Sequence, residues 1–434
     1  DSAACLIRDG EIIAAIQEER FSRIKHDASF PTQAVKACLD IARATIDEVA
    51  YVGYYEKSSL KFNRLLKTYL MYAPRGLSSF LKAMPVWLTE KLQLEKIIRS
   101  ELNFKGPIIC PEHHQSHAAS SFFPSPFKKA AFLTMDGVGE WKTLSYGLAH
   151  GNNINFLEVL NFPHSLGLLY SAFTHYCGFK VNSGEYKLMG LAPYGEPKYI
   201  DIILDNLIDV KDDGSFRLNM RYFNFAVGNT MTNDLFHKLF GRPERKPEAP
   251  IDIFDMDVAA SIQNITENII LRIGSHIYKE TKESNLCLSG GVALNCVANG
   301  RLYREGPFNR IWIQPASGDA GSALGAALWL WHSHLKNPRT ATKLLDHQKG
   351  SLIGTEYSDK KVKIFLDENN IPYTKHKNTE LVNLVATQIA EGNVIGWFSG
   401  RMEFGPRALG GRSIFGDSRS KTMQSIMNFI ANIV

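Results

Sequence analysis

The pattern of apolar and polar positions predicts that the chain opens with a β-hairpin. Apolar runs at residues 4–7 and 12–19 are separated by the tetrapeptide RDGE, and an Asp-Gly pair between two such runs is a strong hairpin signal. A helical pattern with proline in its first turn begins at Pro31, and a strand-like run follows at residues 50–55. The first part of the chain is therefore expected to be one α/β unit.

A second unit begins in the same way. The apolar run at residues 130–136 is followed by the turn DGVGEW and by a strand-like run from Thr143. This second hairpin, again with Asp-Gly in its turn, indicates an internal duplication. Further along, a long helical pattern covers residues 253–280, and short strands at 286–289 and 310–314 alternate with helices. Such alternation is typical of an α/β sheet.

Two segments stand apart from this alternation. Residues 57–105 are rich in lysine, arginine and leucine with helical spacing, which predicts an inserted helical pair whose apolar stripe packs into the core. A lid over the substrate, a partner contact and a membrane-surface helix are the alternatives. The pattern fades at residues 332–350, so we place a domain boundary between about 335 and 355. The rest of the chain is short for a core of its own.

Composition limits the classes of protein to which the chain can belong. It has 434 residues, of which 44% are hydrophobic and 21% are charged, with a net charge of +5. Disorder is therefore disfavoured, and the mild positive charge does not argue for nucleic acid as a partner. No apolar stretch approaches the roughly 18 to 20 residues of a membrane span. The exposed aromatics expected at Trp87 and Trp141 would suit a homodimer contact.

The cysteines and the first residue indicate where the protein is found. Six cysteines are widely scattered without a CxxC pair, which is typical of reduced thiols in a cytoplasmic protein. The chain begins at Asp1 without a methionine or a charged-then-apolar leader. We therefore expect the first residues of the natural protein to be absent from this sequence and not to have been cleaved as a signal.

Histidines and aspartates are placed where they can meet around a metal ion. His113 and His117 lie four apart at the start of a predicted helix, on one face, while Asp136 ends an apolar strand and Asp319 lies at a strand-to-helix transition. Such a mixed shell would suit iron, manganese or zinc. The spacing alone is weak evidence: Asp136 also fits a turn, Asp319 an N-cap, and His114 a structural hydrogen bond.

Glycine-rich turns are candidates for nucleotide binding. Gly290 and Gly291 lie between a strand and a helix, where backbone N–H groups can meet a phosphate. Asn295, one turn into that helix, could bind a ribose or an acyl group, or it could be a surface asparagine. The segment VNSGEYKLMGLAPYGEP, which contains Lys187, has the composition of a loop that closes over a ligand.

A cluster of arginines near the end of the sequence suits anion binding. Arg401, Arg407 and Arg412 lie among glycines just after the strand VIGWF. Guanidinium groups on a constrained loop can bind phosphate or carboxylate groups with two hydrogen bonds each. An exposed basic turn is the alternative.

Taken together and in this order, the motifs resemble those of the O-carbamoyltransferase family that includes nodulation protein NodU, cephamycin CmcH and the tobramycin and ansamycin carbamoyltransferases. The resemblance extends over almost the whole chain. It rests on the segments DSAACLIRDGEIIAAIQEERFSRIKHDASFP, HHQSHAASSFFPS, TMDGVGEW, YKLMGLAPYGEP, SGGVALNCVANGRL, SGDAGSALGAA and GRMEFGPRALGGRS.

The resemblance implies an α/β fold in two parts. Residues 1–345 would form a duplicated domain of the actin/hexokinase-like (ASKHA) type, similar to the tRNA threonylcarbamoyl transferase, with the insertion at 57–105. Residues 346–434 would form a YrdC-like α/β domain. Family members have a strand ending in histidine ahead of the position of Asp1 and continue well beyond the GRS motif, so we expect the YrdC-like domain to be incomplete in this sequence.

The resemblance also implies an activity. The YrdC-like part would join carbamoyl phosphate to ATP, with Mg²⁺, to give carbamoyl adenylate and pyrophosphate, and the larger domain would move the carbamoyl group to a hydroxyl of a small-molecule natural product. A kinase of the same superfamily, or a nucleotide- and metal-binding partner module without complete catalytic parts, is the alternative.

Residue by residue, the resemblance assigns the metal, with iron favoured over zinc and manganese, to His113, His117, Asp136 and Asp319. His26 and Asp27 are candidates for the base that takes the acceptor's proton, with a structural salt bridge as the alternative. The nucleotide and its phosphates are assigned to Gly137, Gly139, Lys187, Gly290, Gly291, Asn295, Gly318, Arg401, Arg407 and Arg412.

Overall fold

A mixed five-stranded sheet lies at the centre of the protein, whose computed structural model describes residues 1–89, 91–341 and 345–427. The strand order is β11-β10-β5-β6-β7, and β6 alone runs antiparallel to its neighbours. The predicted hairpin over residues 130–150 is therefore confirmed, and a third strand extends it. The bounds are β5 (Lys129–Met135), β6 (Lys142–His150), β7 (Asn153–Asn161), β10 (Asn285–Ser289) and β11 (Arg310–Ile313).

The first half of the chain repeats this order of elements in a shorter form. The predicted hairpin joins β1 (Ala3–Arg8) to β2 (Glu11–Gln17). Asp9 and Gly10 both have positive φ, 51° and 85°, as a two-residue hairpin turn requires. The strand expected over residues 50–55 is reduced to two paired residues. The half continues through α1 (Glu19–Ser22), α2 (Thr32–Ala42), β3 (Val52–Gly53), β4 (Ile108–Ile109) and α6 (His113–Phe122), with β3 parallel to β4.

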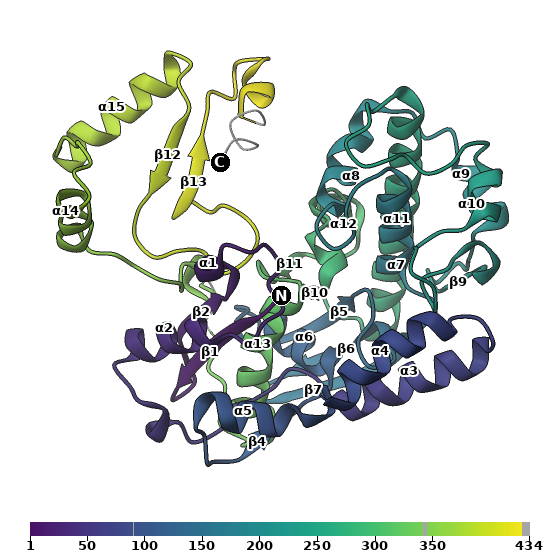
Figure 1. Ribbon diagram of the computed structural model, residues 1–434, viewed down its shortest axis with the longest axis horizontal. Helices are drawn as coiled ribbons and strands as arrows, with labels where there is room; N and C mark the ends of the chain where they lie inside the picture. The colour runs from purple at the N-terminus through teal and green to yellow at the C-terminus, as the bar shows by residue number, and fades with distance from the viewer. Residues whose placement is uncertain (90, 342–344, 428–434) are drawn as a thin grey trace.

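The last helices of the two halves, α6 and α13 (Asp319–Trp329), pack against each other near the centre of Figure 1. A glycine allows this approach, because a Cβ on Gly325 of α13 would lie 1.8 Å from the Ser116 carbonyl oxygen of α6. Beyond Trp329 the chain continues as a π-helix over Leu330–His334. Both helices follow short parallel strands, and their N-terminal ends lie close together, with His113 of α6 3.6 Å from Asp319 of α13.

Helices on the right of Figure 1 cover one face of the central sheet. The long helix predicted at 253–280 is confirmed as α11, which buries Ile262, Ile269 and Ile277 in the main hydrophobic core. Phenylalanines and tyrosines of neighbouring helices complete this core, among them Phe173 and Phe236. The elements are α7 (Leu166–Tyr176), α8 (Glu185–Leu191), α9 (Ile200–Asn206), β8 (Ile208–Val210), β9 (Phe216–Leu218), α10 (Asp234–Leu239), α11 (Ile253–Thr281) and α12 (Cys296–Glu305).

The insertion is helical, as predicted, and lies along the bottom of Figure 1. It consists of three helices and not a pair: α3 (Ser58–Tyr72), α4 (Leu77–Thr89) and α5 (Leu94–Leu102). The expectation that its apolar stripe packs into the core is wrong, because α4 contains no buried residue and Leu70, Leu77 and Leu81 are exposed. The expectation that Trp87 and Trp141 are exposed is wrong, because both side chains are half-buried. Trp87 packs against Phe62 of α3, and Lys67 covers the ring of Trp141.

The C-terminal segment, residues 355–427, lies at the upper left of Figure 1 and has little core of its own. Neither α14 nor α15 contains a buried residue. The predicted boundary at 335–355 coincides with a stretch that lacks long elements, although residues 342–344 lie outside the described part. The elements are α14 (Asp359–Glu368), α15 (Asn378–Ala390), β12 (Ile395–Phe398) and β13 (Arg412–Phe415).

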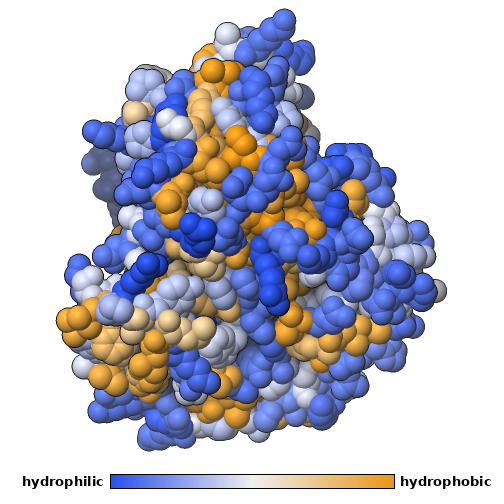
Figure 2. Space-filling view, turned by 90° about the vertical axis from the view of Figure 1, so that its right-hand side faces the viewer, coloured by the Kyte–Doolittle hydropathy of each residue, from blue (hydrophilic) through white to orange (hydrophobic). Residues whose placement is uncertain are grey.

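The surface carries scattered apolar residues. On the side shown in Figure 2, orange apolar patches are bordered by blue polar side chains. Among the described residues, no helix is both long enough and apolar enough to cross a membrane.

Candidate functional site

Two histidines and two aspartates meet where α6, β5 and α13 come together. One donor atom from each of His113, His117, Asp136 and Asp319 lies within 4.8 Å of all the others. His113 Nε2 is 3.1 Å from Asp136 Oδ2 and 3.6 Å from Asp319 Oδ1. The Nε2 atoms of the two histidines are 3.1 Å apart. The structure thus brings together the four residues for which the sequence predicted a metal.

Local structure explains why these side chains converge. In α6 a capping box between Glu112 and Gln115 fixes the first turn, so that His113 and His117 point from one face. Asp136 directly follows β5, and Asp319 is the first residue of α13, just beyond β11. Because β5 and β11 run in the same direction, both aspartates lie at the carboxyl edge of the sheet, where ligands of α/β proteins gather.

The four groups favour positive charge at their centre. Burial opposes protonation of His113, but its hydrogen bond with Asp136 and the nearby Glu56 carboxylate outweigh burial and raise its pKa to about 10. Burial raises the pKa of Asp136 and Asp319, yet their contacts with the two histidines outweigh it and lower both. The two carboxylates that stabilise a protonated histidine would also stabilise a bound metal cation.

The donor set fits a divalent transition metal. Imidazole nitrogens and carboxylate oxygens are ligands of iron, zinc and manganese, and His113 and His117 are 1% and 0% exposed. His114 does not belong to the set. It is fully buried, its Nδ1 lies 2.7 Å from Ser145 Oγ, and burial lowers its pKa well below the usual value. The structural role weighed for His114 is thereby confirmed.

Several buried groups around these ligands were missed by the sequence analysis. Glu56 lies beside His113, with Oε2 3.4 Å from Nδ1, and Ser322 Oγ is 3.2 Å from His117 Nδ1. Glu140 accepts hydrogen bonds from the backbone N–H of His113 and Lys57. No sequence motif marks these contacts, because Glu56 and Glu140 come from segments remote from the helix they serve.

One backbone N–H of the glycine turn after β10 already has a partner within the protein. The sequence predicted that these N–H groups are free to meet a phosphate, but Gly291 N–H donates to Asp136 Oδ1 over 3.2 Å. Gly290 has φ of 87°, and a Cβ there would lie 2.1 Å from the Met135 carbonyl oxygen. Asn295 is buried, not at the surface, and exchanges two hydrogen bonds with Gln263. Nucleotide binding by these residues stays a prediction.

The arginine loop reaches the same turn. Arg407 is exposed and donates to the Leu294 carbonyl oxygen over 3.2 Å. The other two guanidinium groups serve the fold: Arg401 donates to carbonyls of Ile13 and Gly354, and Arg412 to several carbonyls of its own loop. Of the three arginines, Arg407 therefore has the most freedom to bind a phosphate.

A buried carboxylate shapes this loop. Glu403 accepts hydrogen bonds from the backbone N–H groups of Leu409, Gly411 and Arg412. Burial raises the pKa of Glu403, but these backbone hydrogen bonds outweigh burial and lower it. Glu403 thus holds the glycine-rich turn in one conformation, a role that the sequence analysis missed.

His26 and Asp27 lie near the site but differ in their contacts. His26 Nδ1 is hydrogen-bonded to Asp1, and these two residues with Glu19 form a second group of donor atoms within 4.8 Å of one another. Asp1 in turn lies close to Gly318, at the start of α13. Asp27 instead holds Ser29 within its own turn. A role as base fits His26 better than Asp27.

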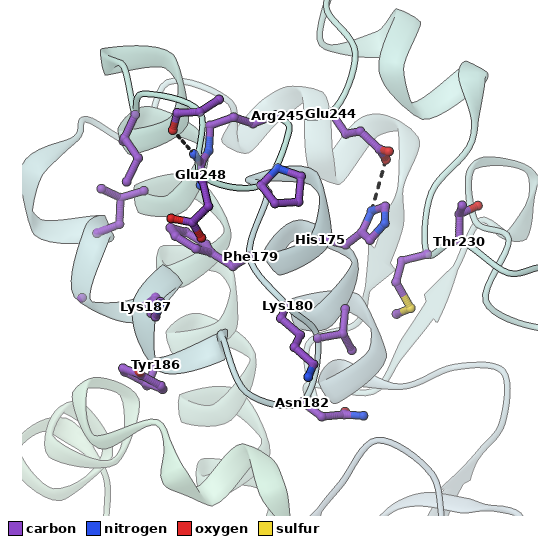
Figure 3. A pocket seen from close by; sticks show the side chains of 18 of the residues that line it. His175, Phe179, Lys180, Asn182, Tyr186, Lys187, Thr230, Glu244, Arg245 and Glu248 are labelled. Carbon is purple, nitrogen blue, oxygen red and sulfur yellow. Dashed lines mark hydrogen bonds and ion pairs between the residues drawn. The ribbon is translucent and has the colours of Figure 1, made fainter. Parts of the chain in front are cut away.

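A large pocket of about 1640 Å³ lies beside α7 and α8, and the four metal candidates are not among its lining residues. Its lining includes Leu168, which lies 4.0 Å from where a Cβ on Gly137 would be. Figure 3 shows Lys180 and Glu248 on two loops, and Tyr186 and Lys187 side by side on α8, around the pocket. The segment with Lys187, which was predicted to be a loop, is therefore helical at this residue and forms part of the pocket wall.

Two of the remaining predicted glycines differ in their surroundings. Gly139 lies against His113, since a Cβ there would be 3.0 Å from the His113 Cβ, while a Cβ on Gly137 would make ordinary van der Waals contact with Leu168 at 4.0 Å. Gly139 thus makes room for the helix α6, whereas Gly137 is not closely packed.

The sequence is similar to known proteins over most of its length. Residues 1–328 match the family described as Carbamoyltransferase N-terminus and residues 386–432 that described as Carbamoyltransferase C-terminus. The uncharacterized protein sll1178 of Synechocystis sp. is 58% identical over 99% of this chain and 71% of its own length. Nodulation protein NolNO of Sinorhizobium fredii is 34% identical over 99% of this chain and 60% of its own length.

Solved structures give weaker matches. Component A of the (R)-2-hydroxyglutaryl-CoA dehydratase of Acidaminococcus fermentans is 15% identical, covers 75% of this chain and 92% of its own, and has a TM-score of 0.39. A score of this size does not establish a shared fold.

Proposed function

Because the chain belongs to the carbamoyltransferase family, we propose that it transfers a carbamoyl group to a hydroxyl of a small molecule. The family membership predicted from the motifs is confirmed by the matches over residues 1–328 and 386–432. The chain spans 60% of NolNO and 55% of the related NolO of Bradyrhizobium diazoefficiens. The complete reaction is therefore part of the proposal.

The proposed reaction uses ATP with Mg²⁺ and carbamoyl phosphate. Water hydrolyses carbamoyl phosphate to carbamate and phosphate. A carbamate oxygen then attacks the α-phosphorus of ATP and displaces pyrophosphate, which gives carbamoyl adenylate. The acceptor's hydroxyl oxygen then bonds to the carbamoyl carbon, AMP leaves and the hydroxyl proton passes to a base. A mixed anhydride of this kind must be kept from water, which a closed site provides.

The observation that carries the proposal is the group of His113, His117, Asp136 and Asp319, which would hold a divalent metal, with iron favoured. Such an ion polarises a carbonyl or lowers the pKa of a bound hydroxyl. The chain's own residues supply the rest. Gly137, which follows Asp136 and where a Cβ would meet only Leu168 at 4.0 Å, would lie beside the carbamoyl group, and Arg407, next to the turn after β10, is placed to bind the adenylate's phosphate.

The acceptor would enter through the pocket lined by Tyr186 and Lys187. Lys25 lies over the Tyr186 ring at 5.0 Å, so the turn that carries His26 faces this wall of the pocket. His26 is then the better candidate for the base, since its imidazole has one nitrogen held by Asp1 and the other free to accept a proton.

We assign the first 345 residues to the actin/hexokinase-like type as part of the same proposal. Support comes from the order of elements: a hairpin, a helix and parallel strands separated by helices occur twice, and each half ends in a helix that reaches the site. The YrdC-like assignment of residues 346–434 remains a prediction from the resemblance.

The test is incubation of the purified protein with ATP, Mg²⁺ and ¹⁴C-carbamoyl phosphate, together with a panel of hydroxylated acceptors. We expect AMP, pyrophosphate and labelled acceptor from the wild type, one equivalent of bound metal, and loss of label transfer and metal in His113→Ala. His150→Ala, which removes an exposed histidine, is the matched control.

Each other outcome contradicts a stated part of the proposal. Formation of ADP in place of AMP would favour a kinase. Metal binding that survives in His113→Ala would show that the four residues are not the metal site. Absence of label transfer with every acceptor, from protein that holds its metal, would favour the partner module without complete catalytic parts.

A further inference from the structure

We infer that Glu56 is a positioning residue for His113 and that Lys61, from the first helix of the insertion, holds Glu56 in place. The inference rests on the proposed metal site. It gives part of the insertion, residues 57–105, a definite task in the reaction: to fix the orientation of one metal ligand.

The first observation is a buried carboxylate behind His113. The Glu56 side chain is 6% exposed, and its Oε2 lies 3.4 Å from His113 Nδ1. The opposite ring nitrogen, Nε2, faces Asp136 and Asp319. A metal between those groups would take Nε2, which leaves the proton on Nδ1, the nitrogen beside Glu56. A carboxylate in this position fixes the tautomer and the ring orientation of a metal-binding histidine.

The second histidine shows the same arrangement with a neutral partner. His117 also turns Nε2 toward the two aspartates, and its Nδ1 lies 3.2 Å from the Ser322 hydroxyl. A hydroxyl is a weaker acceptor than a carboxylate. Glu56 therefore raises the basicity of His113 more than Ser322 raises that of His117, and its removal should have the larger effect on the metal.

A buried carboxylate needs a cation, and Lys61 supplies it. Lys61 Nζ lies 2.8 and 3.1 Å from the two Glu56 oxygens. Lys61 belongs to α3, the first helix of the insertion. The order of contacts is therefore Lys61 to Glu56, Glu56 to His113, and His113 to the metal.

Two further contacts join the start of the insertion to the site. Arg64, also on α3, is buried and donates to the Gly139 carbonyl oxygen over 2.9 Å. The backbone N–H of Lys57 and that of His113 both donate to Glu140. These contacts connect the start of α3 to the start of α6 through Gly139 and Glu140 of the turn after β5.

The experiment measures Co²⁺ binding to the full chain and the visible absorption bands of the bound ion, which report its ligands independently of activity. The variants are Glu56→Gln, Lys61→Gln and the double variant. Glu101→Gln and Lys82→Gln remove the same charges from exposed positions of the segment 57–105 and are the matched controls.

We expect Glu56→Gln to weaken Co²⁺ binding about 10- to 100-fold and to shift the absorption bands, whereas both controls keep wild-type affinity. Lys61→Gln should weaken binding less. The double variant should match Glu56→Gln, because Lys61 acts through Glu56.

Wild-type affinity and unchanged bands in Glu56→Gln would overturn the inference, as would losses that simply add in the double variant. If Glu56→Gln fails to fold, Lys61→Gln decides, since its side chain is 23% exposed. A wild type that binds no Co²⁺ would instead refute the proposed metal site, and the inference with it.

Discussion

At the scale of single residues, Glu140 shows how one carboxylate fixes the start of a functional helix. It is 4% exposed and accepts hydrogen bonds from the backbone N–H of His113 and of Lys57. An acidic group at this position also favours the positive end of the helix dipole. The first histidine of the site therefore depends on a residue from the turn after β5.

We predict that Glu140→Gln destabilises the protein by about 1–3 kcal/mol, because the amide loses one acceptor oxygen and brings N–H donors against the donors of the helix. Urea unfolding measures the difference. Glu368→Gln, at an exposed position of α14, should leave the unfolding free energy as it is in the wild type. Equal stability of the two variants would contradict the role given to Glu140.

His332 gives the protein a pH-dependent stability. It is buried, with Nδ1 3.2 Å from the Asn337 carbonyl oxygen and its ring 4.7 Å from that of Phe123. Burial lowers its pKa to about 4, whereas an unfolded histidine titrates near 6.5. Between these values the unfolded chain takes up a proton that the folded protein does not. His332 therefore contributes a loss of stability as pH falls from about 6.5 to about 4.

The measurement is the unfolding free energy at pH 7 and pH 5 for the wild type, His332→Gln and His150→Gln. The difference between the two pH values should be smaller in His332→Gln, which no longer titrates, and unchanged in His150→Gln, where the histidine is exposed. An equal pH dependence in all three proteins would rule out His332 as a source of the acid sensitivity.

The sequence reveals residues whose partners are near in the chain or follow a strand end. His113 and His117 could be found because helical spacing puts them on one face, and Asp136 because it ends an apolar strand. Glu56 and Ser322 could not, since each acts on a histidine from another element. For Arg401 the sequence suggested a guanidinium available to bind an anion, but in the structure this group donates to backbone carbonyl oxygens of Ile13 and Gly354.

At the scale of elements, the site depends on how closely α6 and α13 approach. Each helix carries ligands in its first turns, so their separation sets the distance between the histidines and Asp319. Gly325 is the contact point, facing the Ser116 carbonyl oxygen and the Ser120 side chain.

We predict that Gly325→Ala destabilises the protein by about 1–3 kcal/mol and weakens metal binding, because a Cβ 1.8 Å from the Ser116 oxygen must push the helices apart. Gly300→Ala on α12 is the matched control. Its Cβ would meet only the end of the Arg304 side chain, so the better helix propensity of alanine should raise stability by up to about 1 kcal/mol. Thermal unfolding and metal titration of both variants measure these differences. If Gly325→Ala has wild-type stability and metal affinity, the two helices do not make the tight contact described.

Elements with a strong local signal could be predicted, and those defined by tertiary contacts could not. The two Asp-Gly hairpins and α11 follow from turn chemistry and periodicity. β7 was missed because it is the last strand of the sheet, and only some of its residues are half-buried. β3 is shorter than the strand predicted over residues 50–55, because only Val52 and Gly53 pair with residues of β4.

At the scale of the whole molecule, the four candidate ligands join the two halves of the chain. His113 and His117 belong to the first half, and Asp136 and Asp319 to the second. A bound ion would therefore act as a link between the halves.

We predict that a chelator lowers the thermal midpoint of the metal-loaded protein. An ion at 100 times its dissociation constant stabilises the folded state by about 2.7 kcal/mol, which corresponds to several degrees. Scanning calorimetry with and without the chelator measures the shift, and His113→Ala should show none. A wild type whose midpoint does not respond would contradict a metal that links the halves.

The arrangement of the C-terminal segment could be foreseen only in outline. The fading pattern near residue 340 marks where it begins, and its length indicated that it has little core. The segment is attached by contacts between residues far apart in the sequence. Ile353, just before it, and Phe404 are buried in the core of the first part, and Arg20 donates to the Gly405 carbonyl oxygen. Its YrdC-like nature, the cytoplasmic location and a homodimer stay predictions.

Arg401 makes hydrogen bonds that attach the C-terminal segment to the first part of the chain. Its guanidinium donates to carbonyl oxygens of Ile13 in the β1–β2 hairpin and of Gly354 at the start of the segment. Because α14 and α15 bury no residues, other attachments of the segment also lie near Arg401, among them those of Phe404, Gly405 and Arg407. Removing the guanidinium leaves part-buried carbonyls without a donor, which costs about 1–3 kcal/mol.

Arg401→Ala should therefore increase the rate at which a protease cuts within residues 355–427 by about 5- to 150-fold, the population change that corresponds to 1–3 kcal/mol. The fragment that contains residues 1–341 should persist, since the main core around α11 contains no residue of the segment. Arg419→Ala, which removes an exposed guanidinium paired only with Asp417 among the described residues, should be cut at the wild-type rate. If Arg401→Ala is also cut at that rate, the segment is held by the Phe404 contacts and not by Arg401.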